Sequence, residues 1–198
     1  GVVSFCSTFF YVKHSEKDNN ETEILLMTSC NPVYLAALNV VGDIEGVTVT
    51  NLSQPSTGCL HDYTLTTEDM KNLSHADILV VNGGGMEGYL DDVVSAYPNL
   101  PVIDTFEYIE HETSLFEELG IEAEEEHSET ASEIDASEVE EEHDHGDVNS
   151  HIWMNETLYA SQVDAIAEGL SEFDAKNAKQ YQANAASYKT VIASQIDK

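Results

Sequence analysis

Residues 58–90 read GCLHDYTLTTEDMKNLSHADILVVNGGGMEGYL, and this stretch decides the fold. Its middle, Ala76–Asn82, is a continuous apolar run of the kind that forms a strand buried on both faces of a parallel sheet. Thr66 and Asp69 have the spacing of a capping box, which predicts a short helix ending near Leu73. The stretch therefore alternates helix and strand, as α/β proteins do.

Similar units lie on both sides of this stretch. A helix is expected at Pro32–Val41, where Pro stands in the first turn and Gly42 follows the end, and another at Met86–Tyr97. The expected strands are Glu23–Cys30, Val47–Leu52, Ala76–Asn82 and Pro101–Thr105. This alternation predicts an α/β fold with a four-stranded parallel sheet flanked by helices.

The charge of the chain limits its partners. The formal net charge is −31, from 38 acidic residues against 7 Lys and Arg. Such a surface repels phosphate backbones and anionic lipid, which argues against nucleic acid and against direct membrane binding. It attracts cations, although a high negative charge also serves solubility alone.

The two ends of the chain differ in pattern from the α/β units between them. Residues 1–22 begin with a short apolar run that is typical of the end of a signal peptide, and a polar linker follows it. Within that run Val3–Cys6 faintly resembles a lipoprotein cleavage site. Asn155 is expected to cap a helix to about Leu170, and Asp174 is expected to cap the next one. That last helix, within 173–198, has an apolar stripe and no terminating signal, which predicts a missing partner domain.

An acidic tract at 121–146 interrupts the ordered part of the chain, 23–172. It carries His127, His143 and His145 among Glu and Asp, and we interpret it as a mobile insertion. One hypothesis is that these histidines capture metal ions weakly, and the alternative is a solvated loop without a ligand. The sequence from His143 also matches most of a metallohydrolase signature, H-x-H-x-D-H, but Val148 replaces its last histidine.

Of the three cysteines, Cys30 closes the first expected strand and Cys59 follows the next one. The carboxyl ends of adjacent parallel strands lie close together, so a disulfide between these residues is geometrically allowed. It would indicate an oxidising, extracytoplasmic compartment. Two buried free thiols are an equal alternative.

The loop Gly83–Gly88 satisfies the dinucleotide-binding pattern G-x-G-x-x-G, and Asp104 lies near the position of a ribose-binding acid. A nucleotide-binding or redox α/β enzyme is therefore an alternative function. Against it, two βα units precede the loop, and no basic residue stands nearby. Glycines that turn the chain tightly into a helix explain the pattern better.

Two histidines are candidates for a metal site. His61 lies in the loop that leaves the carboxyl end of an expected strand, the edge where parallel sheets bind ligands. His151 stands just before Ile152-Trp153-Met154 and the expected cap Asn155, at the entry to a helix. Neutral imidazoles at such places are ligands for transition metals.

Together, the stretch 58–90, the acidic tract, SHIWMN at 150–155 and the last helix resemble the metal-binding class of ABC-transporter substrate-binding proteins. The resemblance covers residues 23–198. It implies the amino-terminal lobe of a two-lobe protein, with His61 and His151 as metal ligands and residues 173–198 as the start of the helix between lobes. The resemblance also implies a second lobe, expected beyond these residues, which would supply a His or carboxylate and then an Asp or Glu.

The resemblance also implies a function. Such a protein is no enzyme: it captures Zn²⁺, or Mn²⁺, outside the cytoplasm, in the periplasm or at the cell surface, and delivers it to an ABC-type permease. Some members are described as surface adhesins, which is a further alternative. The histidines of the acidic tract favour zinc. This chain has Asn149-Ser150 where many members have Asp-Pro, and Leu60 where some zinc-specific members have Glu.

Overall fold

A sheet of parallel strands forms the centre of the computed structural model, which describes residues 23–53, 63–120 and 149–196. The strands are β1 (Ile24–Thr28), β2 (Val47–Asn51), β3 (Ile78–Val81) and β4 (Val102–Asp104). Their order is β2-β1-β3-β4, and every pair is parallel. Leu26 of β1 stands in register with Val49 of β2 and with Ile78 of β3. The predicted four-stranded parallel sheet is confirmed.

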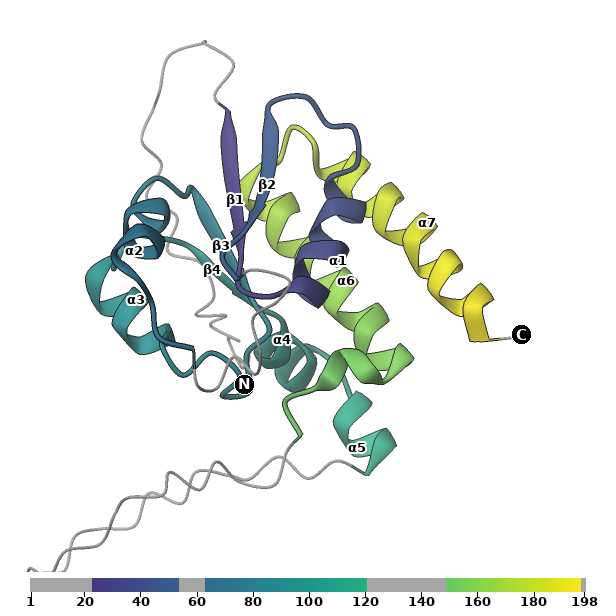
Figure 1. The fold of residues 1–198 in the computed structure, drawn as a ribbon. Helices are drawn as coiled ribbons and strands as arrows, with labels where there is room; N and C mark the ends of the chain where they lie inside the picture. The colour runs from purple at the N-terminus through teal and green to yellow at the C-terminus, as the bar shows by residue number, and fades with distance from the viewer. Residues whose placement is uncertain (1–22, 54–62, 121–148, 197–198) are drawn as a thin grey trace, which may run out of the picture.

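Helices cover both faces of this sheet. They are α1 (Asn31–Val41), α2 (Thr67–Leu73), α3 (Leu90–Ala96), α4 (Thr105–Glu112), α5 (Leu115–Leu119), α6 (Glu156–Phe173) and α7 (Ala178–Ile196), with a short 3₁₀ helix, η2, at Ile152–Met154. In Figure 1, α1, α6 and α7 lie on one side of the strands, and α2 and α3 lie on the other. The result is a three-layer α/β arrangement.

The two faces of the sheet bury separate apolar cores, because successive residues of a strand point to opposite sides. Leu26, Ile78 and Val80 pack with α1, α6 and α7. Met27 packs on the opposite face with α2 and α3. All four residues of β3 are fully buried, which explains why its sequence is apolar throughout.

The long helices α6 and α7 pack against each other after a short turn. Tyr181 of α7 is fully buried, and its hydroxyl donates to Asp174 at 2.8 Å. Further along, Lys189 of α7 pairs with Asp164 of α6. Asp174 was expected to cap α7, and that prediction is wrong: it is the residue at which α6 ends, and its carboxylate binds the Tyr181 hydroxyl instead.

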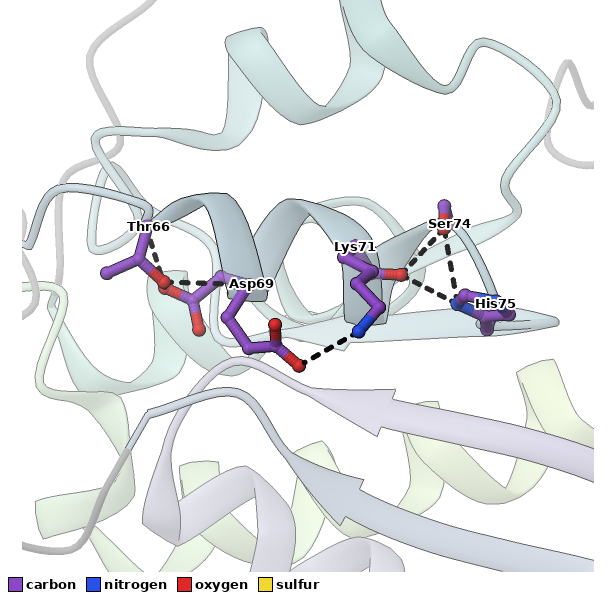
Figure 2. Close-up of polar contacts among 6 residues, drawn as sticks. Thr66, Asp69, Lys71, Ser74 and His75 are labelled. Atoms are coloured by element: carbon purple, nitrogen blue, oxygen red, sulfur yellow. Dashed lines mark hydrogen bonds and ion pairs between the residues drawn. The ribbon is translucent and has the colours of Figure 1, made fainter.

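Figure 2 shows the capping box predicted for α2. The Thr66 hydroxyl accepts from the main-chain N–H of Asp69 at 3.2 Å, and the Asp69 carboxylate accepts from the Thr66 N–H at 2.8 Å. At the other end of the helix, His75 Nδ1 and the Ser74 hydroxyl both lie within hydrogen-bond distance of the Lys71 carbonyl. Both ends of this short helix are therefore satisfied by side chains.

The structure adds two helices that the sequence patterns did not predict, α4 and α5, after the last strand. It also starts α3 at Leu90, whereas the helix was expected from Met86. The residues between are held by turns and by a buried Glu87. Among the described residues, none of the helices has the length and apolar character that crossing a bilayer requires.

Candidate functional site

The carboxyl ends of the four strands meet at one edge of the sheet, which lies toward α4, α5 and the start of α6 in Figure 1. The segment 149–155 enters this edge from a distant part of the chain and leads into α6. Of the predicted ligands, the structure describes His151 here. The other predicted histidines, His61, His127, His143 and His145, and the cysteine Cys59, lie outside the described residues.

His151 is half-buried immediately before η2. Its main-chain N–H donates to Asn149 Oδ1 at 3.0 Å, and its ring Nδ1 lies 2.8 Å from the same oxygen. The indole of Trp153 packs beside the imidazole, with the ring centroids 5.0 Å apart and the planes tilted by 53°. The imidazole is therefore oriented by a side-chain amide and an aromatic ring.

A buried polar network ties this segment to the sheet. Asn82, fully buried at the end of β3, donates from Nδ2 to the Ser150 carbonyl at 2.8 Å. Its Oδ1 accepts from Gln162 Nε2 of α6 at 3.0 Å, and Gln162 also donates to the Thr105 hydroxyl at 2.7 Å. Thr105 closes the ring by donating to the Asn82 carbonyl at 2.9 Å. The residue before His151 is thus fixed to β3, α4 and α6 together.

Tyr63, two residues after His61, is the first described residue after the loop that carries that histidine. Its hydroxyl donates to Asp69 at 2.9 Å, and its ring meets that of Tyr89 edge to face at 5.8 Å. Hydrogen bonds from the hydroxyls of Tyr63 and Thr66 and from the Thr66 main chain outweigh the effect of burial and lower the pKa of Asp69. The hydrogen bonds of Tyr63 and Thr66 to Asp69 thus fix the chain at the start of α2.

The glycine loop turns the chain around a buried carboxylate. Glu87 accepts from the main-chain N–H groups of Asn82 and Gly83, at 2.9 and 3.0 Å, and from the Ser29 hydroxyl at 2.5 Å. Burial raises the pKa of Glu87 in spite of these bonds. Because its own carboxylate takes the N–H groups that a phosphate would need, the loop does not favour nucleotide binding.

Asp104, considered above as a ribose-binding acid, has a structural role instead. Its Oδ1 accepts from the N–H groups of Phe106 and Glu107, both at 3.0 Å, so it caps α4. It also lies against Gly83, where any Cβ would overlap the carboxylate. Two acidic side chains at this edge, Asp104 and Glu87, are therefore occupied by main-chain N–H groups.

Cys30 is buried as a free thiol between β1 and α1, at the N-cap of α1. Burial is the main cause that raises the pKa of this thiol to about 11. As a free thiol it is therefore protonated at neutral pH. Its predicted partner, Cys59, lies outside the described residues, so the disulfide stays a prediction.

The edge thus presents one oriented imidazole, that of His151. Within residues 23–53, 63–120 and 149–196, no three His, Cys, Asp or Glu side chains converge to hold a metal ion. The sequence patterns singled out His151, whose role as a ligand stays a prediction, and missed Asn82 and Gln162. A signal existed for both: each is an amide at an otherwise apolar position of its strand or helix.

Comparisons with known proteins agree on one family. Residues 26–198 match the family model described as "Zinc-uptake complex component A periplasmic", ZnuA. The chain is 24% identical over 190 residues to the zinc-binding protein AdcA of Streptococcus pyogenes, covering 94% of this chain and 35% of AdcA. It is 24% identical over 176 residues to the high-affinity zinc uptake system protein ZnuA of Yersinia pestis, covering 88% of this chain and 54% of that protein.

Solved structures share the fold. The Zn(II)-bound ZnuA-like domain of Streptococcus pneumoniae AdcA has a TM-score of 0.62 at 17% identity, over 87% of this chain and 52% of that one. The substrate-binding protein FpvC of Pseudomonas aeruginosa, in complex with Mn²⁺, has a TM-score of 0.62 at 22% identity, over 86% of this chain and 52% of that one. The chain spans about a third to a half of the length of these relatives.

Proposed function

The chain belongs to the ZnuA family of zinc-uptake components, and from this we propose that it captures a divalent transition metal, foremost Zn²⁺, and delivers it to an ABC-type permease. The family match over residues 26–198 is the observation that carries the proposal. The relatives are named as zinc-binding or zinc-uptake proteins. Capture outside the cytoplasm, in the periplasm or at the cell surface, is part of the same proposal.

We assign the metal to the carboxyl edge of the sheet, with His61 and His151 as ligands. His151 is described there, and Tyr63 anchors the chain at the same edge two residues after His61. Imidazole nitrogens suit Zn²⁺, and a tetrahedral site needs two further ligands. We propose that a second lobe supplies them, a His or carboxylate and an Asp or Glu, and that they decide between Zn²⁺ and Mn²⁺.

No covalent bond is made or broken in this function, so the protein acts as a carrier and not as an enzyme. The metal is its cargo. The net charge of −31 attracts cations toward the lobe. We further propose that His127, His143 and His145 in the acidic tract hold metal ions loosely and raise their concentration near the tight site.

A zinc titration of the chain tests the site. Loss of an outer-shell partner weakens metal binding by about 10- to 100-fold. The variants His61→Ala and His151→Ala each remove a proposed ligand itself, so each should weaken zinc binding by at least that factor. His75→Ala is the matched control, because His75 binds the end of its own helix. If neither His61→Ala nor His151→Ala changes the affinity, the assignment is wrong.

A deletion of residues 122–146 separates the loose sites from the tight one. We expect the deletion to lower the number of zinc ions bound and to spare the binding that depends on His151. Loss of that binding on deletion would contradict the proposed division of roles.

A further inference from the structure

One oxygen of Asn149 contacts His151 twice. Asn149 Oδ1 accepts from the main-chain N–H of His151 at 3.0 Å and lies 2.8 Å from ring atom Nδ1. The first contact identifies the atom, because an N–H group can only donate and its partner must be the amide oxygen rather than the amide nitrogen. The orientation of the Asn149 amide thus follows from chemistry.

The second contact then fixes the proton on the ring. An amide oxygen only accepts, so Nδ1 of His151 must carry a hydrogen to bond at 2.8 Å. In a neutral imidazole the other nitrogen, Nε2, then holds the lone pair. A metal ion binds that lone pair, so this tautomer presents Nε2 as the ligand atom.

We infer that Asn149 is a positioning residue, which holds His151 in the Nδ1–H tautomer and so offers Nε2 to the metal. The inference rests on the proposed function for its metal part only. It extends that function by naming a residue that does not touch the metal and yet sets the strength of one ligand. Outer-shell partners of this kind fix the tautomer and the ring orientation of metal-binding histidines.

Two further contacts make the orientation specific. The Ser150 carbonyl, between the two residues, is held by Asn82 Nδ2 at 2.8 Å. The Trp153 ring lies 5.0 Å from the imidazole and limits the rotation of its plane. Because main chain and ring are both restrained, the Asn149 oxygen is in place before any metal arrives.

The kind of oxygen matters as well. An amide oxygen is neutral, whereas a carboxylate at the same position carries charge and makes a stronger hydrogen bond with the Nδ1–H group. A stronger bond raises the basicity of Nε2 and tightens its bond to the metal. We therefore expect Asn149→Asp to keep the tautomer and bind zinc at least as tightly, and Asn149→Ala to lose both properties.

The test is a ¹⁵N-detected NMR spectrum of the histidine side chains in the 198-residue chain, without metal and then during a zinc titration. The spectrum reports His151 separately from the histidines of the acidic tract. Wild type and Asn149→Asp should show the Nδ1–H tautomer. Asn149→Ala should shift His151 toward the Nε2–H tautomer that predominates in free histidine, and its zinc affinity should fall about 10- to 100-fold.

Asn155→Ala is the matched control, because Asn155 is an exposed asparagine like Asn149, and its Oδ1 caps α6 by accepting from the N–H groups of Thr157 and Leu158. It should leave the His151 tautomer unchanged, even if it lowers stability. A wild-type spectrum with the Nε2–H tautomer, or an unchanged tautomer in Asn149→Ala, would overturn the inference.

Failure of the proposed function gives a different result. If the tautomer shifts in Asn149→Ala but zinc does not perturb His151 in any variant, then His151 is no ligand, and the proposed function fails while the hydrogen bond stands. If zinc binds His151 equally well in Asn149→Ala and wild type, Asn149 does not tune the site, and the inference fails alone.

Discussion

Asn82 should be the residue on which the candidate site depends most for its shape. Its side chain is fully buried and makes three hydrogen bonds: Nδ2 donates to the carbonyls of Gly83 and Ser150, at 3.0 and 2.8 Å, and Oδ1 accepts from Gln162 at 3.0 Å. The Asn82→Ala variant removes all three and leaves a small cavity. At a net value of about 1 kcal/mol for each hydrogen bond, the free energy of unfolding should fall by about 3 kcal/mol.

The partner groups make this figure a lower bound. Gln162 Oε1 is already buried without a hydrogen-bond partner among the described residues. After the substitution its Nε2 keeps only Thr105, so a buried amide would be largely unsatisfied. A buried polar group without partners costs about 1–3 kcal/mol. We therefore expect a total loss of about 3–5 kcal/mol.

Urea unfolding followed by tryptophan fluorescence measures the effect, because the single tryptophan, Trp153, lies in the segment that Asn82 holds. Asn39→Ala is the control: Asn39 is exposed and binds only the carbonyl of Leu35 in its own helix. Its variant should stay within about 0.5 kcal/mol of wild type. A loss below about 1 kcal/mol in Asn82→Ala would refute the reasoning that the network holds segment 149–155.

Three further changes probe the surroundings of the site. Gly84→Ala should lower the melting temperature more than Gly120→Ala. Both glycines have positive φ, but of the two only Gly84 has a neighbour, the Phe106 ring, that an added Cβ would overlap. Equal losses would show that backbone strain alone matters. Glu87→Ala should cost about 2–4 kcal/mol in urea unfolding, since two main-chain N–H groups lose their acceptor; a neutral result would contradict the role given to this carboxylate. Asp69 has a lowered pKa, so its contribution to stability is present above the usual carboxyl pKa of about 3.9 and is lost as the pH falls through the lower folded value. The free energy of unfolding should therefore fall less steeply at acid pH in Asp69→Asn than in wild type. An equal fall in both would show that Asp69 does not contribute to the loss of stability at acid pH.

Much of the fold was predictable because its signals are local. The apolar run at Ala76–Asn82 predicts a buried strand, and β3 occupies its centre. The capping box of Thr66 and Asp69 and the cap of α6 at Asn155 are both present, since each needs only residues within one turn of a helix. The strand order β2-β1-β3-β4 was not predicted, because β2 and β3 follow each other in the chain but are not neighbours in the sheet.

The structure departs from the local patterns at Asp174 and at Asp104, for different physical reasons. Asp174 has the type and position of a helix cap, but the packing of α7 on α6 places the Tyr181 hydroxyl at its carboxylate. Asp104 fits the spacing of a ribose-binding acid, yet it caps α4, a helix whose acidic sequence gives little periodic signal. At Asp174 tertiary structure overrides a local pattern. At Asp104 the local cap of a helix that was not predicted forms instead.

The candidate site shows the same division. The placement of His151 before a helix followed from the residues next to it in the chain. Its attachment did not, because Asn82 and Ser150 are 68 positions apart, and Asn82 and Gln162 are 80 positions apart. No spacing rule connects them. Only the crossing of β3, α4 and α6 at one edge brings their side chains together.

The side-chain amides of Asn82 and Gln162 lie where the proposed function needs side chains held in a fixed direction. Apolar packing is non-directional, so the cores on the two faces of the sheet hold its layers together without aiming any one side chain. A metal ligand must be held to within about 0.5 Å of its working position. Hydrogen bonds have the required directionality, and the bonds that join Asn82, Thr105 and Gln162 supply it. Under the proposed function, Asn82, Thr105 and Gln162 thus supply at the carboxyl edge a directional restraint that the apolar cores cannot, and it acts on the Ser150 carbonyl next to His151.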